Sequence, residues 1–356
     1  MSTPAPSGPL PHVGLLAFLR RRLGWASGTA YAAAAVLPAP GLWLRHPHTV
    51  LLSGRLGVDV SVTQMLLATV LFTAGLRAGP GALAGVLRRP WILLSGLTLH
   101  LTAPLLVIPA VALALRCSPD ADGGSGMVAA MILTVAMPVA AGATVWTSQG
   151  RGDEAAMLGL VVASTLASPL TLPAVIRTLS PLLNPDYARS VAVVASGTGS
   201  GFALTGVLLP CGAGIVCRLL LPDRAKRTAL SMAALIAVLA ALLLTYVNAC
   251  GAIGQFLARP RPLLLLGGAL TAGAVCLLSF GWGACWARVL RLGASARTSV
   301  ALACGMSNSS AGAVLITTAM PDRPQILLPV LAFSLLQKAV AHRMTRPRPA
   351  RPVRPA

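Results

Sequence analysis

Ten long apolar stretches make up most of this 356-residue chain, and they limit what it can fold into more than any other feature. A hydrocarbon core about 30 Å thick is crossed by about 20 helical residues, which is close to the length of each stretch. The sequence therefore predicts a membrane protein with about ten transmembrane helices, at residues 26–44, 60–76, 91–115, 127–148, 155–176, 202–221, 228–248, 262–286, 298–318 and 325–341.

The composition agrees with a membrane protein built from helices. Hydrophobic residues make up 56% of the chain and charged residues 10%, and the mean hydropathy is +0.78. Soluble domains carry about 25% charged residues. Lipid offers backbone amides no hydrogen-bond partners, and runs this long and continuously apolar lack the alternation of membrane strands. We therefore expect an all-α membrane protein.

The placement of the basic residues accounts for the net charge of +20. If the N-terminus is cytoplasmic, 20 of the 28 Lys and Arg residues fall in segments on that side, and 8 fall on the other. Loops rich in Lys and Arg stay in the cytoplasm, and an even number of crossings returns the chain to the same side. We expect an integral protein of a bacterial inner (plasma) membrane with both termini cytoplasmic. Nucleic acid is not an expected partner, because no aromatic residues accompany the charge.

The chain divides at the ends of its apolar region. Residues 1–25 are predicted to form a cytoplasmic N-terminal segment, and residues 26–342 a transmembrane domain with helices 1–5 at about 26–176 and helices 6–10 at about 202–341. In the tail, 343–356, Arg alternates mostly with Pro and Ala, which is typical of disorder and predicts contact with anionic lipid headgroups. Cleavage of the first stretch as a signal peptide stays open.

The fourth apolar stretch of each half is interrupted by small or polar residues. Proline removes a backbone donor and clashes with the preceding helical turn, and four successive polar side chains break the ninth stretch. Interruptions at matching places in two halves are typical of transporters that bind solute where the breaks meet. The predicted substrate or ion crossover region contains Pro138, Gly142, Thr144, Gly305, Ser307, Asn308, Ser309 and Ser310. Alternatively, these Ser and Asn residues only join helices and the proline only kinks one.

Ionisable side chains are almost absent from the apolar stretches, which argues against catalysis. All eight acidic residues lie in predicted loops or at the ends of stretches. Hydrolases need carboxylates, histidines or a paired nucleophile, and proton pumps keep a carboxylate within the membrane. We expect no enzymatic activity and no catalytic residue. His100 is the one histidine inside a predicted span, and it is either a residue of the solute pathway or a side chain that bonds between helices.

Several motifs give the chain a resemblance to the bile acid:sodium symporter family, from about residue 30 to residue 342. They are Leu71-Phe72-Thr73-Ala74-Gly75-Leu76 leading to Arg88-Arg89-Pro90, Pro138 followed by Gly152-Asp153, Ser164-Thr165-Leu166 with Pro169, and Arg297 leading into Gly305-Met306-Ser307-Asn308. The resemblance implies two inverted five-helix repeats with discontinuous fourth and ninth helices. It also implies uptake of an organic anion, driven by sodium in a standard member.

The chain departs from the family where the resemblance would place the sodium ligands. Ala143 and Thr144 replace a serine and an asparagine of the fourth helix, and Ala303 replaces the glutamate of the ninth. Met157 and Val161 stand where hydroxyl ligands are expected. Sodium needs several oxygen ligands, and a carboxylate offsets the cost of its dehydration. We therefore expect no cofactor, and transport that depends little on sodium.

Together these patterns predict a secondary transporter that moves a small organic solute, expected to be anionic, by alternating access. One alternative is a membrane sensor or scaffold that keeps the carrier fold without transport. Another is an auxin-efflux-type carrier, which shares a similar Met-Pro followed by small residues. The Gly305-Met306-Ser307-Asn308 segment favours the symporter family.

Overall fold

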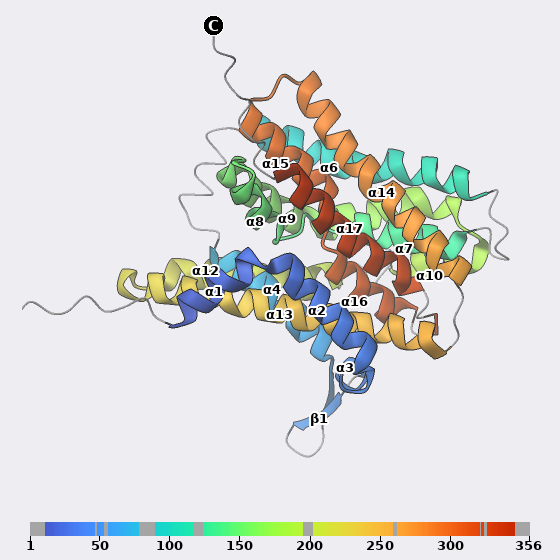
Figure 1. Ribbon diagram of the computed structural model, residues 1–356, viewed down its shortest axis with the longest axis horizontal. Helices are drawn as coiled ribbons and strands as arrows, with labels where there is room; N and C mark the ends of the chain where they lie inside the picture. Colours follow the sequence, from blue (N-terminus) through green and yellow to red (C-terminus); the bar gives the residue numbers. More distant parts are fainter. Residues whose placement is uncertain are drawn as a thin grey trace, which may run out of the picture.

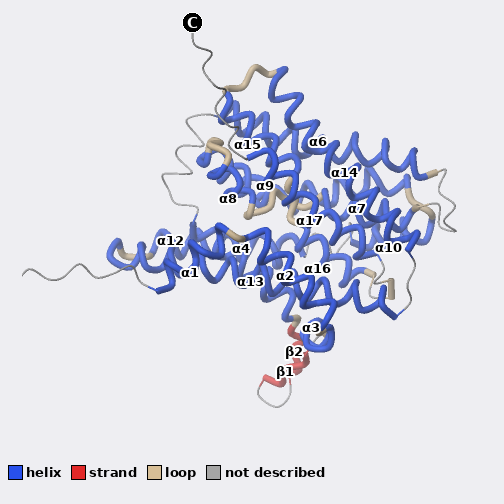
Figure 2. Tube along the Cα trace, viewed as in Figure 1, coloured by secondary structure: helices blue, strands red, loops and turns tan. Residues whose placement is uncertain are grey.

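The computed structural model describes residues 11–46, 48–52, 56–77, 90–116, 124–194, 202–258, 262–320, 322–323 and 326–345. Over these residues the chain is helical, apart from connecting turns and one hairpin (Figures 1 and 2). The hairpin pairs β1 (His48–Leu52) with β2 (Leu56–Val60) in antiparallel register. The sequence prediction contained no strand; this short stretch between two apolar stretches is rich in β-branched residues, which favour extended structure.

Helices occupy the stretches predicted for the first half. The first stretch is divided at Leu37, because the following Pro38 disfavours the helical conformation in the residue before it. The helices are α1 (Pro11–Arg21), α2 (Leu23–Val36), α3 (Pro38–Arg45), α4 (Val62–Arg77), α6 (Pro90–Leu115), α7 (Ser125–Val135), α8 (Ala143–Gln149) and α9 (Glu154–Leu179). Helix α1 lies within the segment expected to precede the membrane domain, and its Leu16 packs against Ala234 and Leu235.

The second half follows its predicted stretches in the same way. A short 3₁₀ turn and a short helix join the halves, and the sixth predicted span begins with a π-helical segment. The elements are η1 (Ser180–Leu182), α10 (Pro185–Val193), η3 (Phe202–Leu208), α12 (Leu209–Leu220), α13 (Asp223–Ala258), α14 (Pro262–Val289), α15 (Ala294–Gly305), α16 (Ser309–Ala319) and α17 (Leu327–Thr345). The basic tail beyond Thr345 lies outside the described residues.

Four of the described helical segments are long and apolar enough to cross a membrane: Pro90–Leu115, Glu154–Leu182, Asp223–Gly251 and Pro262–Val289. They coincide with the third, fifth, seventh and eighth predicted spans. The other predicted spans correspond to shorter or broken helices. The protein is therefore an integral membrane protein.

The helices form two groups that lie side by side (Figure 1). In one group α13 packs against α2, α3 and α4, and α12 packs against α4. In the other, α14 contacts α6, α15 and α17, while α6 also contacts α9. Two glycines explain how closely α4 and α12 approach: a Cβ at Gly75 would meet the carbonyl of Cys211, and one at Gly214 would meet the carbonyl of Phe72.

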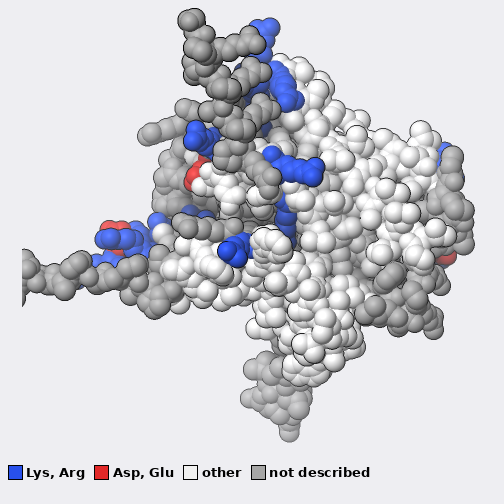
Figure 3. Space-filling model, in the orientation of Figure 1, with Lys and Arg blue, Asp and Glu red and all other residues white. Residues whose placement is uncertain are grey.

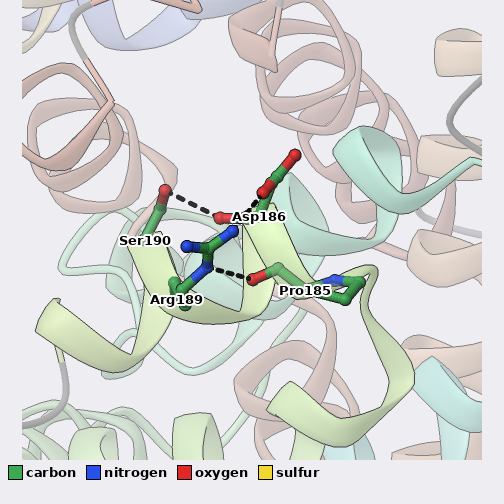
Figure 4. A network of polar contacts seen from close by, with 4 residues as sticks. All are labelled: Pro185, Asp186, Arg189 and Ser190. Carbon is green, nitrogen blue, oxygen red and sulfur yellow. Dashed lines mark hydrogen bonds and ion pairs between the residues drawn. The ribbon is translucent and has the colours of Figure 1, made fainter.

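Helix α10, in the connection between the halves, is stabilised by local contacts (Figure 4). Pro185 occupies its first turn, where a missing N–H costs nothing. Arg189 donates to Asp186 over 2.6 Å and to the carbonyl of Pro185 over 3.3 Å, and Ser190 donates to the carbonyl of Asp186. These side chains are exposed, so the ion pair contributes little to stability. All of these hydrogen bonds join residues of α10 itself.

Basic side chains gather at one end of the face shown in Figure 3. They lie over the end that carries α8, α12 and α15, and the opposite end is nearly free of them. This separation is what the loop-by-loop count of Lys and Arg predicts for a protein oriented by the positive-inside rule. The orientation of the termini stays a prediction.

Candidate functional site

The fourth and ninth predicted helices are both discontinuous, and their breaks contact each other. Helix α7 ends at Val135 and α8 begins at Ala143, while α15 ends at Gly305 and α16 begins at Ser309. Val139 and Ser307 form an isolated antiparallel β-bridge between the two breaks. Ala140 N donates to Met306 O over 2.7 Å, and Asn308 N donates to Pro138 O over 2.9 Å. Two segments far apart in sequence therefore form a backbone-bonded crossover.

Each break finds partners for the backbone groups that it frees. Pro138 cannot donate a hydrogen bond, so it ends the helical ladder, and its carbonyl is free to accept from Asn308. The N–H of Val139 donates to Ser164 Oγ of α9 over 3.1 Å. Asn308 caps α16, since its Oδ1 accepts from Ala311 N over 3.2 Å. The sequence pattern at the crossover is thus explained by hydrogen bonding.

The two predicted glycines of the crossover have different surroundings. Gly305 packs against the ring of Phe280, which a Cβ on Gly305 would overlap, whereas a Cβ on Gly142 would have nothing within 4 Å. Gly305 is therefore required by packing, and Gly142 faces open space.

A cavity of about 170 Å³ lies beside the crossover, between the two groups of helices. Six of the predicted site residues line it: Gly142, Thr144, Ser307, Asn308, Ser309 and Ser310. The predicted residues Pro138 and Gly305 do not, and act through the backbone and through packing instead. The other lining residues come mainly from α4, α13 and α17.

Three charged or amide side chains of these walls were not among the predicted site residues, and neither were hydroxyl residues such as Thr73, Thr245 and Ser334. Arg77 lines the cavity from α4, and Gln337 and Lys338 line it from α17. Sequence reasoning assigned Lys338 to a cytoplasmic end by counting charges, but the structure places it at the cavity. The sequence does contain a pattern that indicates a polar helix face here: Ser334, Gln337 and Lys338 recur at helical spacing on one face of an apolar helix.

Gln337 connects α17 to the crossover. Its Nε2 donates to Ser309 Oγ over 3.1 Å, while its buried Oε1 has no hydrogen-bond partner among the described residues. The crossover therefore has two side-chain amides close to it, Asn308 and Gln337, where the sequence indicated one. No Asp or Glu is among the described residues that line the cavity.

A second hollow adjoins the first. It shares Arg77, Thr144, Val145 and Leu158 with the cavity, and continues along Ser148, Gln149, Glu154 and Ala155. These residues belong to the loop end of α8 and the start of α9. The cavity thus has a neighbouring opening toward one end of the helices.

His100 lies outside the lining of the cavity. It is buried, with its Nδ1 3.0 Å from the carbonyl oxygen of Ala303 and its Nε2 3.3 Å from that of Met137. Of the two interpretations of this residue, the structure supports a side chain that bonds between helices.

The positions where the resemblance would place sodium ligands are buried and mostly apolar. Ala143, Met157, Val161 and Ala303 are at most 2% exposed. The hydroxyl of Thr144 donates to the carbonyl of Ala141 over 2.8 Å. No group of three or more His, Cys, Asp or Glu side chains that could hold a metal ion occurs among the residues that the structure describes.

Comparison with known proteins agrees with this architecture. A family model described as the Sodium Bile acid symporter family matches residues 64–259, which is more than half of the chain. A protein of Bacillus subtilis (strain 168), described as "Uncharacterized sodium-dependent transporter YocS", is 24% identical over 260 residues, covering 72% of this chain and 74% of the relative. The chain belongs to the sodium bile acid symporter family.

Proposed function

We propose that this protein is a secondary transporter of a small organic anion, and that it moves its solute by alternating access around the crossover. The observation that carries the proposal is the charge of the cavity. Two basic residues, Arg77 and Lys338, line it, and no acidic residue is among its described lining. A basic lining without carboxylates attracts anions and repels cations.

The start of α16 adds to the preference of the cavity for anions. Asn308, Ser309 and Ser310, which form its N-cap and first turn, line the cavity. The first N–H groups of a helix have no partner within the helix, and the helix dipole gives this end a partial positive charge. The N–H groups of Asn308, Ser309 and Ala311 already donate to Pro138 O, Ser307 O and Asn308 Oδ1, so this helix end contributes the partial charge of its dipole. The ammonium group of Lys338 contributes a full charge.

The size of the cavity favours a small solute. At about 170 Å³ it is close to a cavity of about 150 Å³ that holds a benzene molecule. A monocyclic or short-chain acid fits this space. A sterol acid would have to extend into the neighbouring hollow lined by Ser148 and Glu154.

The proposal includes ten membrane crossings in two inverted five-helix repeats, within residues 26–342, and both termini in the cytoplasm of a bacterium. It is supported by the helices at all ten predicted stretches, the paired breaks and the distribution of basic residues. Under this orientation the hollow beside Glu154 opens toward the cytoplasm, so the structure represents an inward-facing state. Reporter fusions after Ala341 test the orientation, and a periplasmic signal would contradict it.

Sodium is not required in this proposal. Buried alanine, methionine and valine side chains occupy positions that the resemblance assigns to cation ligands, and they offer no side-chain oxygen. No cofactor is needed for the transport cycle, and no group at the cavity suggests catalysis.

Uptake of radiolabelled organic acids into proteoliposomes tests the function. We expect saturable uptake of at least one small monocarboxylate at equal rates in sodium and potassium buffers. Uptake of cations or neutral analogues in preference to acids would contradict the proposal, and so would a steep sodium requirement. Stabilisation by an acid without any uptake would assign the protein as a membrane sensor instead.

A further inference from the structure

Lys338 lines the cavity, and no acidic side chain of the described lining is there to pair with it. Its ammonium group makes no hydrogen bond or ion pair with another described residue. Arg77, the other basic residue of the lining, also borders the adjoining hollow, which contains Glu154. Within the described part of the chain, Lys338 therefore depends on the solute for an anionic partner.

The cavity gives protons a route to Lys338. At about 170 Å³ it has room for several water molecules, since one needs about 10–15 Å³. The adjoining hollow shares Arg77 and Thr144 with the cavity and continues to Glu154, an exposed residue at the start of α9. Water in these two adjoining spaces can carry protons between Lys338 and one end of the helices.

Other titratable groups near α17 lie outside the lining of the cavity. Helices α7, α8 and α16 pack against α17 and carry none over their described lengths. The charged residues of α13 lie in its first turns, from Asp223 to Arg227, and Arg288 of α14 and His342 and Arg343 of α17 lie in last turns. The neutral titratable groups on α13, α14 and the nearby α2 are Tyr246, Cys250, Cys276, Cys285 and Tyr31, the last of which donates to the carbonyl of Leu331. Of the charged groups named, Arg77 is the one that shares the cavity with Lys338.

We propose that Lys338 carries the coupling proton of this transporter, so that each solute anion crosses the membrane together with one proton. This inference rests on the proposed transport function. The ammonium group binds the carboxylate, and the neutralised pair is enclosed when the two groups of helices close around the cavity. After the anion leaves, closure would enclose an unpaired charge among mostly apolar side chains, which is costly. One N–H bond of the ammonium group then breaks, its electron pair stays on Nζ, and the proton passes to water on the side where the anion was released.

A proton makes fewer demands on the site than a sodium ion does. The buried Ala143, Met157, Val161 and Ala303 offer a metal ion no side-chain oxygen, whereas a proton needs one amine. A lysine can release its proton when its surroundings change, but the guanidinium group of an arginine stays charged in proteins. The variant Lys338→Arg therefore separates binding of the anion from release of the proton.

Proton uptake on binding tests the inference without any transport. Monocarboxylates from butyrate to benzoate are added to purified protein in a weakly buffered solution at mildly alkaline pH. We expect the unaltered protein to take up protons as an acid binds, because the bound carboxylate holds Lys338 in its ammonium form. Lys338→Arg should bind the acid without taking up protons. The control is Lys226→Arg, which changes the other lysine of the chain, paired with Asp223, and should behave like the unaltered protein. Binding to the unaltered protein without proton uptake would overturn the inference.

Accumulation in proteoliposomes without sodium tests the coupling. With one proton per anion, a gradient of one pH unit, alkaline inside, supports about tenfold accumulation. We expect the unaltered protein and Lys226→Arg to reach it faster than protein-free vesicles, which measure the passage of undissociated acid through lipid. Lys338→Arg should exchange labelled for unlabelled acid but accumulate it no faster than protein-free vesicles do.

The two tests separate the proposals. If the unaltered protein binds acids but transports none, the proposed function fails, and proton uptake on binding still decides whether Lys338 gains a proton with the acid. If acid is transported but a pH gradient does not speed its accumulation, or Lys338→Arg accumulates it as well as Lys226→Arg does, the proposed function stands and proton coupling at Lys338 is wrong.

Discussion

The break between α7 and α8 covers seven residues, 136–142, whereas the break between α15 and α16 covers three, 306–308. The longer break has a proline and small residues, and it relies on Ser164 of another helix to satisfy a freed N–H. The shorter break has polar side chains and caps its own next helix through Asn308. The first break thus supplies room and backbone, and the second supplies polar groups to the cavity.

The walls of the cavity next to the two breaks also differ in their polar groups. The side next to the shorter break carries Gln337 and Lys338 of α17, and Gln337 bonds to Ser309. The side next to the longer break carries Gly142 and Thr144, and the Thr144 hydroxyl is already bonded to Ala141. Specific recognition of the solute should therefore depend mainly on the second half, and the following variants test this difference.

The largest expected effect is that of removing the charge of Lys338. Lys338→Met keeps the length and the apolar stem but removes the partner of the solute carboxylate. We expect binding to weaken by about 2 kcal/mol or more, which is about thirtyfold in Kd. Lys338→Arg is the control, because it keeps the charge and should bind more tightly than Lys338→Met. Titration of an acid found in the uptake screen measures this, and equal affinity of Lys338→Met and the unaltered protein would exclude Lys338 from recognition.

Gly142, in the first break, and Gly305, directly before the second break, can be compared as a matched pair of substitutions. In Gly305→Ala the new methyl group overlaps the ring of Phe280, and we expect a loss of about 1–3 kcal/mol in stability. Gly142→Ala places its methyl group in open space, so its effect on stability should stay within about 1 kcal/mol. Thermal unfolding in detergent compares them, and similar midpoints would show that the two breaks tolerate bulk equally.

Substitution of Ser164 tests the hydrogen bond that α9 supplies to the first break. Ser164→Ala leaves the buried N–H of Val139 without its acceptor, at a cost of about 1–2 kcal/mol. Ser168→Ala is the control on the same helix, since the Ser168 hydroxyl donates to the carbonyl of Thr165 in its own helix. A midpoint of Ser164→Ala no lower than that of Ser168→Ala would mean that the first break does not depend on α9.

The smallest stability effect is expected at the cap of α16. Asn308→Ala removes the acceptor for Ala311 N and should cost about 1 kcal/mol, whereas Asn308→Asp keeps an acceptor there. Solute binding should weaken in both, because Ala loses the side-chain amide and Asp adds negative charge to the cavity. Unfolding midpoints and acid titrations measure the two properties separately. Recovery of binding together with stability in Asn308→Asp would show that Asn308 is only a cap.

Part of the site was predictable because it depends on residues adjacent in sequence. Pro138 lacks a backbone N–H and is followed by small residues, which favours a helix break, and Asn308 followed by Ser309 and Ser310 is a local start signal for a helix. Six of the predicted crossover residues line the cavity. Lys338 was missed, since a count of charges by loop assumes that a basic residue near a helix end faces water.

The sequence by itself determined the class of the protein, the position of its helices, the two breaks and the family, because hydrophobic length and local backbone chemistry decide them. Only the tertiary structure decided which groups meet. His100 reaches the carbonyl of Ala303 across 203 residues, and Tyr246 donates to the carbonyl of Leu37 across 209. Such pairs depend on how helices pack, and packing depends on the shapes of all the side chains between them. The sequence next to His100 does not indicate which two carbonyl groups its ring contacts.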